Sequence, residues 1–228
     1  MVAFAIVLAE RLEVSELAVH MARAELQRFR EKKAGRKFSG IVLAEGKSSR
    51  MGQNKAELRL QGKSLLEWQV EKLRAIGIHD ILLSGANCQN LPGTRVVPDL
   101  YPDRGPLGGL HACLRAAENP QCVVVTVDTP LLPASILSKM CRAHECGVTA
   151  LQHGEKLEPL IAVYDCSISE EIEPLIAQHS APVRALRDRV DWSTFCYRGS
   201  EDLLLNCNTP EEFRAAEDYL AAEAGFVG

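Results

Sequence analysis

The sequence lacks the features that mark several large classes of protein. It has no basic excess: the formal net charge of its 228 residues is −4, so composition gives no sign of a DNA- or RNA-binding surface. It shows no export or membrane signal, because the apolar opening over residues 1–9 is too short to span a bilayer and has no basic region. We therefore expect a cytoplasmic protein, with neither nucleic acid nor membrane as a partner.

Cysteine occurs eight times but never as a C-x-x-C pair. Cys141, His144 and Cys146 lie close together in sequence, yet their spacing fits no common zinc site and a second ligand pair is missing. A chain of this length buries a core without needing disulfides. We expect scattered, reduced thiols.

The first 36 residues differ in composition from the rest, with no proline and no glycine before Gly35. Apolar side chains recur at roughly helical spacing through Leu8, Leu12, Val19, Leu26 and Phe29. We predict one or two helices over 1–36, forming a packing or dimerising N-terminal extension. A weaker alternative is the first half of a helix-turn-helix, although Glu13 stands where the turn glycine is usual. The second predicted domain covers 37–228.

From Phe38 onward, short apolar runs alternate with helical patterns. The runs predict strands over 38–44, 80–84, 95–98, 122–127, 148–151 and 160–164. The helical patterns cover 64–76, 107–117, 133–146, 169–178 and 209–222. The β-branched run over 122–127 is typical of a central strand buried on both faces. We expect an α/β fold with a mostly parallel sheet, whose ligands lie beyond the carboxyl ends of the strands.

A polar, glycine-bearing loop over 43–55 follows the first predicted strand. Gly46 lets a phosphate approach the backbone N–H groups, and Ser48 adds a hydroxyl donor. Arg50 and Lys55 supply positive charge for a triphosphate or for leaving pyrophosphate. The loop does not match the Walker pattern. By itself it is explained equally well as an ordinary polar loop.

Asp128 directly follows the long buried strand, so we expect its carboxylate in the ligand crevice. Mg²⁺ takes carboxylate oxygens together with substrate oxygens, so Asp128 is the predicted ligand, with Mn²⁺ as the alternative ion. The simpler alternative is an aspartate that caps the following turn. Further along, Asn206 and Asn208 alternate on one strand face, which the capping of the next helix by Thr209 does not explain.

These motifs together resemble the molybdenum cofactor guanylyltransferases over about residues 38–222. Residues 43–55 are similar to their L-A-G-G-x-S-x-R-M-G-x-x-K motif, except that Glu45 stands where the family usually has a glycine. Residues 105–109 match G-P-L-x-G, residues 128–130 match D-x-P, and residues 206–212 match N-x-N-T-P-E-E. Without the resemblance, the second motif is also explained as a turn that leads into a helix.

The resemblance implies a three-layer α/β sandwich, a Rossmann-like nucleotidyltransferase fold, for residues 37–228. It also implies transfer of GMP from GTP to the molybdopterin cofactor, with release of pyrophosphate. Transient contact with other cofactor-biosynthesis proteins or with a molybdoenzyme would follow. The alternatives are a cytidylyltransferase or sugar-phosphate nucleotidyltransferase of the same fold, and a nucleotide-binding protein that has lost activity. Glu45, a carboxylate beside polyphosphate, favours the last of these.

By resemblance, Lys55, Arg50 and Asp128 are the catalytic residues, and Asp128 and Asn208 hold the metal. The residues expected to bind the nucleotide are Leu43, Ala44, Glu45, Gly46, Ser48, Arg50, Lys55, Ser84, Asp99, Gly105, Pro106, Leu107 and Asp128. The residues expected to face the second substrate are Glu158, Pro159, Arg184 and Asn206. Arg184 has the alternative of belonging to a solvated basic helix face.

Overall fold

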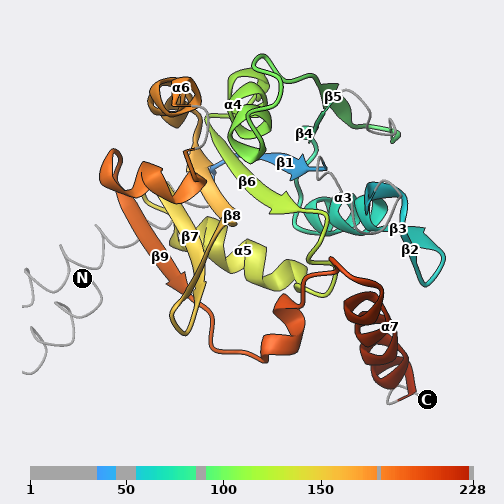
Figure 1. The fold of residues 1–228 in the computed structure, drawn as a ribbon. Helices are drawn as coiled ribbons and strands as arrows, with labels where there is room; N and C mark the ends of the chain where they lie inside the picture. The colour runs from blue at the N-terminus through green and yellow to red at the C-terminus, as the bar shows by residue number, and fades with distance from the viewer. Residues whose placement is uncertain (1–34, 45–54, 86–90, 179–180, 226–228) are drawn as a thin grey trace, which may run out of the picture. The chain divides into compact units, whose positions relative to one another are not determined.

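The computed structural model describes residues 35–44, 55–85, 91–178 and 181–225 (Figure 1). The chain divides into two units, Met1–Lys37 and Phe38–Gly228, and the strands and helices of the described residues belong to the second unit. The helical extension expected over 1–36 falls almost entirely outside the described residues. Its helices, and the domain boundary at residue 36, therefore remain predictions.

A seven-stranded sheet of order β5-β4-β1-β6-β8-β7-β9 forms the centre of the second unit. Its strands are β1 (Ser39–Leu43), β4 (Ile81–Ser84), β5 (Arg95–Val97), β6 (Gln121–Thr126), β7 (Val148–His153), β8 (Lys156–Asp165) and β9 (Trp192–Cys196). Only β8 runs against its neighbours, whereas the pairs β1–β4, β1–β6, β4–β5 and β7–β9 are parallel. The prediction of a mostly parallel sheet is confirmed.

Helices cover both faces of this sheet (Figure 1). The helices α3 (Leu65–Ala75) and α5 (Ala134–Ala143) pack on one face, and α4 (Pro106–Ala116) and α6 (Ser169–Ala177) on the other. The last helix, α7 (Pro210–Gly225), contributes to the same apolar cluster as α3 and α5 and contacts the strand Arg59–Leu60. Successive strand residues point to opposite faces, so Val123 and Val125 enter the first layer's core while Val124 enters the second. The predicted three-layer sandwich is confirmed, and β6 is buried on both faces as expected.

Local sequence explains where the helices begin. At α3 the Ser64 hydroxyl accepts from the Glu67 N–H at 3.1 Å, while the Glu67 carboxylate accepts from the Ser64 N–H at 2.7 Å. Thr209 and Glu212 form the same reciprocal pair at the start of α7. Gly77, at a φ of 84°, follows the end of α3, as its position in the sequence predicts.

The sequence patterns missed several short or edge elements. Strand β9 was not predicted, because it lies at the edge of the sheet and its residues are exposed or half-buried. Strand β8 begins at Lys156 rather than near residue 160, since its polar first half pairs with β7 as a hairpin. Also unpredicted were the two-stranded hairpin β2 (Arg59–Leu60) and β3 (Lys63–Ser64), and the 3-10 helices η1 (Lys55–Glu57), η2 (Cys166–Ile168), η3 (Val183–Asp188) and η4 (Glu201–Leu204). Within the described ranges, no helix combines the length and apolar character needed to cross a bilayer.

Candidate functional site

The carboxyl ends of β1, β4 and β6 lie side by side at one edge of the sheet. Leu43, the last residue of β1, is in register with both Ser84 and Thr126. The Ala44 N–H donates to Ser84 Oγ at 3.4 Å, and the Val127 N–H donates to the Leu43 carbonyl at 3.4 Å. The predicted nucleotide residues Leu43, Ala44 and Ser84 therefore meet at this edge, where ligands of parallel sheets bind.

The Asp99 carboxylate lies against the first turn of α4. A Cβ atom added to Gly108 would be 3.1 Å from Asp99 Oδ2, and one added to Gly109 would be 2.9 Å from Ser84 Cβ. A side chain at either position would thus make contacts shorter than normal van der Waals distances. Only residues without a side chain let Asp99, Ser84 and the start of α4 approach in this way, which explains Gly108 and Gly109.

Gly105 precedes α4 with φ 58° and ψ −151°, a backbone conformation that residues with a side chain adopt only under strain. Pro106 then occupies the first helical position, where its missing N–H costs nothing. The positive end of the α4 dipole consequently faces the same edge as Asp99 and Ser84. Gly105, Pro106 and Leu107 are therefore at the same end of the sheet as Ser84 and Asp99, and their role in binding the nucleotide remains a prediction.

Asp128 leaves the end of β6 with its carboxylate and its carbonyl each held by a donor. Thr126 Oγ1 donates to Asp128 Oδ1 at 2.5 Å, and the Cys207 N–H donates to the Asp128 carbonyl at 2.7 Å. The second bond places the segment of Asn206 and Asn208 beside Asp128, although about 80 residues separate the two motifs. Residues 205–208 form no strand, so the prediction that the two asparagines share one strand face is wrong. Asn208 is fixed in turn, because its N–H donates to Glu212 Oε2 at 2.7 Å.

The oxygen atoms near Asp128 are of the kind that bind a hard divalent cation, and they are few enough for the cation to keep much of its own water. No group of three or more His, Cys, Asp or Glu side chains able to hold a metal occurs in the described parts of the chain. If Asp128 and Asn208 hold a metal, as the resemblance predicts, they would supply one carboxylate and one amide oxygen and leave the remaining positions to substrate and water. Mg²⁺ is usually bound in this way, through one or two carboxylates plus phosphate oxygens.

Comparison with known proteins identifies the family. Residues 40–192 match the family described as the MobA-like NTP transferase domain. The chain belongs to this family. The molybdenum cofactor guanylyltransferase of Xanthomonas euvesicatoria pv. vesicatoria is 37% identical over 182 residues, covering 78% of this chain and 93% of that protein. The one from Rhizobium meliloti is 35% identical over 198 residues, covering 79% and 90%. The recognition made on the sequence motifs is confirmed, and so is the class of enzyme, a nucleotidyltransferase.

Solved structures agree on the fold. The molybdopterin-guanine dinucleotide biosynthesis protein A of Archaeoglobus fulgidus matches with a TM-score of 0.68 at 24% identity, covering 81% of this chain and all of that one. A nucleotidyl transferase from Methanothermobacter thermautotrophicus matches with a TM-score of 0.70 at 19% identity, covering 83% and 100%. At these identities the likeness concerns the fold, which is the predicted nucleotidyltransferase architecture.

The residues expected to face the second substrate come from three separate segments of the chain. Glu158 and Pro159 lie in the first half of β8, which runs antiparallel to β6 and therefore begins at the same edge as Asp128. Glu158 is paired there with Lys156 at 2.6 Å. Arg184 lies exposed in η3, on the connection between α6 and β9. Its role remains a prediction.

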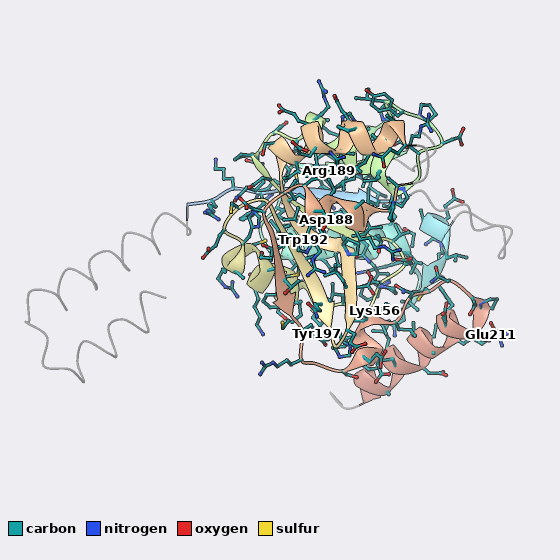
Figure 2. The ribbon with its side chains drawn as sticks, turned by 60° about the vertical axis from the view of Figure 1, so that its left-hand side comes forward. Lys156, Asp188, Arg189, Trp192, Tyr197 and Glu211 are labelled. Atoms are coloured by element: carbon teal, nitrogen blue, oxygen red, sulfur yellow. The ribbon has the colours of Figure 1, made fainter. Side chains whose placement is uncertain are left out.

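Two arginines that follow Arg184 closely in the sequence, Arg187 and Arg189, lie at the opposite end of the strands. Arg187 and Arg189 line an open cavity of about 540 Å³ together with Asp165, Asp188 and Asp191. Figure 2 shows Asp188 and Arg189 near the start of β9, whereas Lys156 lies towards its far end. The arginines are accompanied by carboxylates there, so they do not add positive charge to the nucleotide edge.

Four predicted residues of the first loop, Glu45, Gly46, Ser48 and Arg50, lie outside the described residues. Of Lys55, the structure describes the backbone at the start of η1. Their assignments to the triphosphate remain predictions.

Two buried polar residues of α3 were not predicted from the sequence. Gln69 Nε2 and Lys72 Nζ both donate to the carbonyl of Thr129, the residue after Asp128. Desolvation lowers the pKa of Lys72 to about 7, an effect opposed by an electrostatic interaction with Cys207. A sequence signal was present, because both residues interrupt the apolar stripe of α3 at helical spacing. Polar residues in such a stripe indicate a buried partner.

Proposed function

We propose that this chain transfers GMP from GTP to the molybdopterin cofactor, giving the guanine dinucleotide form of the cofactor and pyrophosphate. The observation that carries the proposal is the meeting of the family motifs at one sheet edge. Ser84 and Asp99 contact the start of α4, and the backbone of Cys207 joins the Asn206–Asn208 segment to Asp128. The relatives bearing the guanylyltransferase name cover most of this chain and nearly all of their own length, which supports GTP as the nucleotide.

In the proposed reaction a terminal phosphate oxygen of the pterin attacks the α-phosphorus of GTP. The new P–O bond forms as the bond to the β-phosphate breaks, and pyrophosphate leaves with the electron pair. Asp128 and Asn208 would hold Mg²⁺, which supplies positive charge at the α-phosphate. Lys55 and Arg50 stabilise the triphosphate and the leaving group. The chain has no need of its own nucleophile, since positioning and electrostatics lower the barrier.

The nucleoside half of GTP is proposed to lie between the ends of β1 and β4 and the start of α4. Leu43 and Ala44 line one side, and Gly105, Pro106 and Leu107 line the other. Asp99 would accept hydrogen bonds from the nucleoside, and the position of its carboxylate against the first turn of that helix supports this role. Glu158, Pro159 and Asn206 would then face the molybdopterin cofactor across Asp128.

We further propose Mg²⁺ as the physiological ion, with Mn²⁺ able to replace it, and a cytoplasmic location, where GTP is supplied. One structure of the same fold, from Mycobacterium tuberculosis at 18% identity and a TM-score of 0.60, is a complex with manganese. Transient contacts with other cofactor-biosynthesis proteins or with a molybdoenzyme remain predictions.

Turnover with each nucleotide tests the function directly. The full chain is incubated with molybdopterin cofactor, Mg²⁺ and either GTP or CTP, and pyrophosphate release is followed. We expect release with GTP and a kcat/KM for GTP at least about a hundredfold above that for CTP, equivalent to roughly 2.7 kcal/mol. A preference for CTP would assign the chain to the cytidylyltransferases. Nucleotide binding without pyrophosphate release would overturn the enzymatic assignment.

A further inference from the structure

The face of α3 that packs on the sheet carries two polar side chains among leucines. Leu65, Leu66 and Leu73 of this face are fully buried, as their spacing predicts. Gln69 is 1% exposed and Lys72 is 9% exposed on the same face. An amine and an amide so deeply buried need partners, since an unpaired polar group in a protein interior is costly.

Both side chains find their partner in one backbone carbonyl. Gln69 Nε2 donates to the Thr129 carbonyl at 3.0 Å, and Lys72 Nζ donates to the same oxygen at 3.1 Å. Lys72 Nζ also donates to Gln69 Oε1 at 3.3 Å, which orients the amide. The two donors use both lone pairs of the carbonyl, so the peptide group between Thr129 and Pro130, one residue beyond Asp128, is held from the α3 layer.

A third segment reaches the same place. Cys207 is fully buried, its N–H donates to the Asp128 carbonyl at 2.7 Å, and its thiol is close enough to Lys72 to act on its charge. The D-x-P turn therefore lies between two contacts, with α3 on one side and the 206–208 segment on the other. Each contact is made to a backbone carbonyl of the turn rather than to the carboxylate.

We propose that Lys72, together with Gln69, is a positioning residue for nucleotidyl transfer. By fixing the Thr129 carbonyl it sets the direction of the Asp128 carboxylate and the place of Asn208 relative to it. This inference rests on the proposed function, because it assigns Lys72 a part in the same site. Lys72 acts through the backbone of Thr129, so it is distinct from the residues proposed to contact substrate.

Stability alone does not explain a lysine at this position. The Thr129 carbonyl already has one donor in Gln69, and an apolar side chain of similar length would fill the same space. Burial lowers the pKa of Lys72 to about 7, against about 10.4 for an unperturbed lysine. The unfolded chain therefore binds the proton of this lysine more strongly than the folded chain does. As the pH falls from about 10 to about 7, this difference lowers the free energy of unfolding. Below about pH 7 both states are protonated, so the destabilisation stays constant. Replacing Lys72 with an apolar side chain removes this destabilisation.

The test replaces Lys72 by methionine in the full chain. We expect Lys72→Met to lower kcat by about 10- to 100-fold, the usual effect of losing a side chain that orients a metal ligand, while the KM for GTP changes by less than about threefold. We also expect the melting temperature at pH 6 to stay equal or to rise, because the buried charge is gone. A residue with a purely structural role would instead lose melting temperature and activity together.

Two further variants sharpen the result. Lys139→Met removes an exposed lysine of α5 and should leave kcat and melting temperature unchanged. Gln69→Met should resemble Lys72→Met, and the double variant should lose little more than the worse single one, because both act on one carbonyl. Parental kcat in Lys72→Met, or independent and multiplying losses in the double variant, would overturn the positioning role.

Metal binding separates this inference from the proposed function. Mn²⁺ is titrated into the parent chain and into Lys72→Met, each with GTP present, and free Mn²⁺ is followed by electron paramagnetic resonance. We expect Lys72→Met to bind Mn²⁺ about 10- to 100-fold more weakly, and equal affinities would contradict the positioning role. Absence of turnover in the parent chain would instead contradict the proposed function, while the Mn²⁺ comparison would still test the role of Lys72.

Discussion

Asp128 is the side chain on which the proposed chemistry depends most. Its carboxylate accepts from Thr126 and its carbonyl accepts from Cys207, so its direction is fixed before substrate arrives. We expect Asp128→Ala to lower turnover by more than about a hundredfold, because charge stabilisation at the α-phosphate is lost. Circular dichroism should show an unchanged fold, since Asp128 is only partly buried. A rate near that of the parent would remove Asp128 from the metal-binding role.

Gly109 illustrates how a single missing side chain shapes the site. Its added Cβ would stand 2.9 Å from Ser84 Cβ and 3.0 Å from Ser84 Oγ. We expect Gly109→Ala to destabilise the fold by about 1–3 kcal/mol through overpacking and to raise the KM for GTP. Chemical denaturation and steady-state kinetics measure the two effects.

A second substitution checks this explanation. Ser84→Gly removes both clashing atoms, so the Gly109→Ala defect in KM should be partly reversed in the double variant. If the double variant is as impaired as the sum of the two single changes, the close approach of Ser84 and Gly109 is not the cause.

At the scale of elements, α3 has a capping box at its first turn and two polar side chains on its buried face. Its capping box joins Ser64 and Glu67, and Gln69 and Lys72 follow on the side that packs under the D-x-P turn. The cap fixes where the helix begins. The contacts of Lys72 depend on that starting point.

We expect Ser64→Ala to lower the free energy of unfolding by about 1 kcal/mol, the usual effect of losing an N-cap. Ser135→Ala, an exposed serine in the first turn of α5, serves as the control and should change it by less than about 0.5 kcal/mol. Urea denaturation measures both. Equal losses in the two variants would show that the Ser64 cap does not contribute to the free energy of unfolding beyond the effect of an ordinary surface serine.

Strands and helices with a strong period were predictable, and weakly patterned ones were not. The run over 122–127 identified β6 because a strand buried on both faces is continuously apolar. Strand β9 has no such run, since an edge strand with exposed side chains needs none. Short 3-10 segments such as η3 carry no distinctive period, so only the structure reveals them.

On the scale of the whole molecule, the sheet has two chemically different edges. The carboxyl ends of the parallel strands carry the proposed site. At the opposite edge, Asp80 accepts from Ser39 Oγ at 2.5 Å, from the Glu118 N–H at 2.9 Å and from the Arg95 guanidinium at 2.6 Å. Burial by itself would raise the pKa of Asp80, but these donors together lower it. This edge therefore anchors the fold through an ionised carboxylate.

The pH dependence of stability follows from that lowered pKa. A carboxyl whose pKa is lower in the folded state contributes stability fully above its unfolded pKa, about 3.9, and loses it as the pH falls through the folded value. We expect Asp80→Asn to cost about 2 kcal/mol at pH 7, as for hydrogen bonds to a charged group. The difference from the parent should shrink below about pH 4. Thermal melts at pH 7, 5 and 3 measure it, and a difference that grows on acidification would contradict the assignment.

The sequence by itself determined the α/β class, the mostly parallel sheet and the family. It also determined which motifs lie together, because the carboxyl ends of parallel strands share one edge. Only the tertiary structure decided that Gln69 and Lys72 hold the turn after Asp128, across 60 and 57 residues of sequence. It also decided that Arg187 and Arg189 lie at the opposite end of the strands. Local pattern shows that a side chain is buried, whereas its partner depends on how the layers pack, and that is settled only when the whole chain is folded.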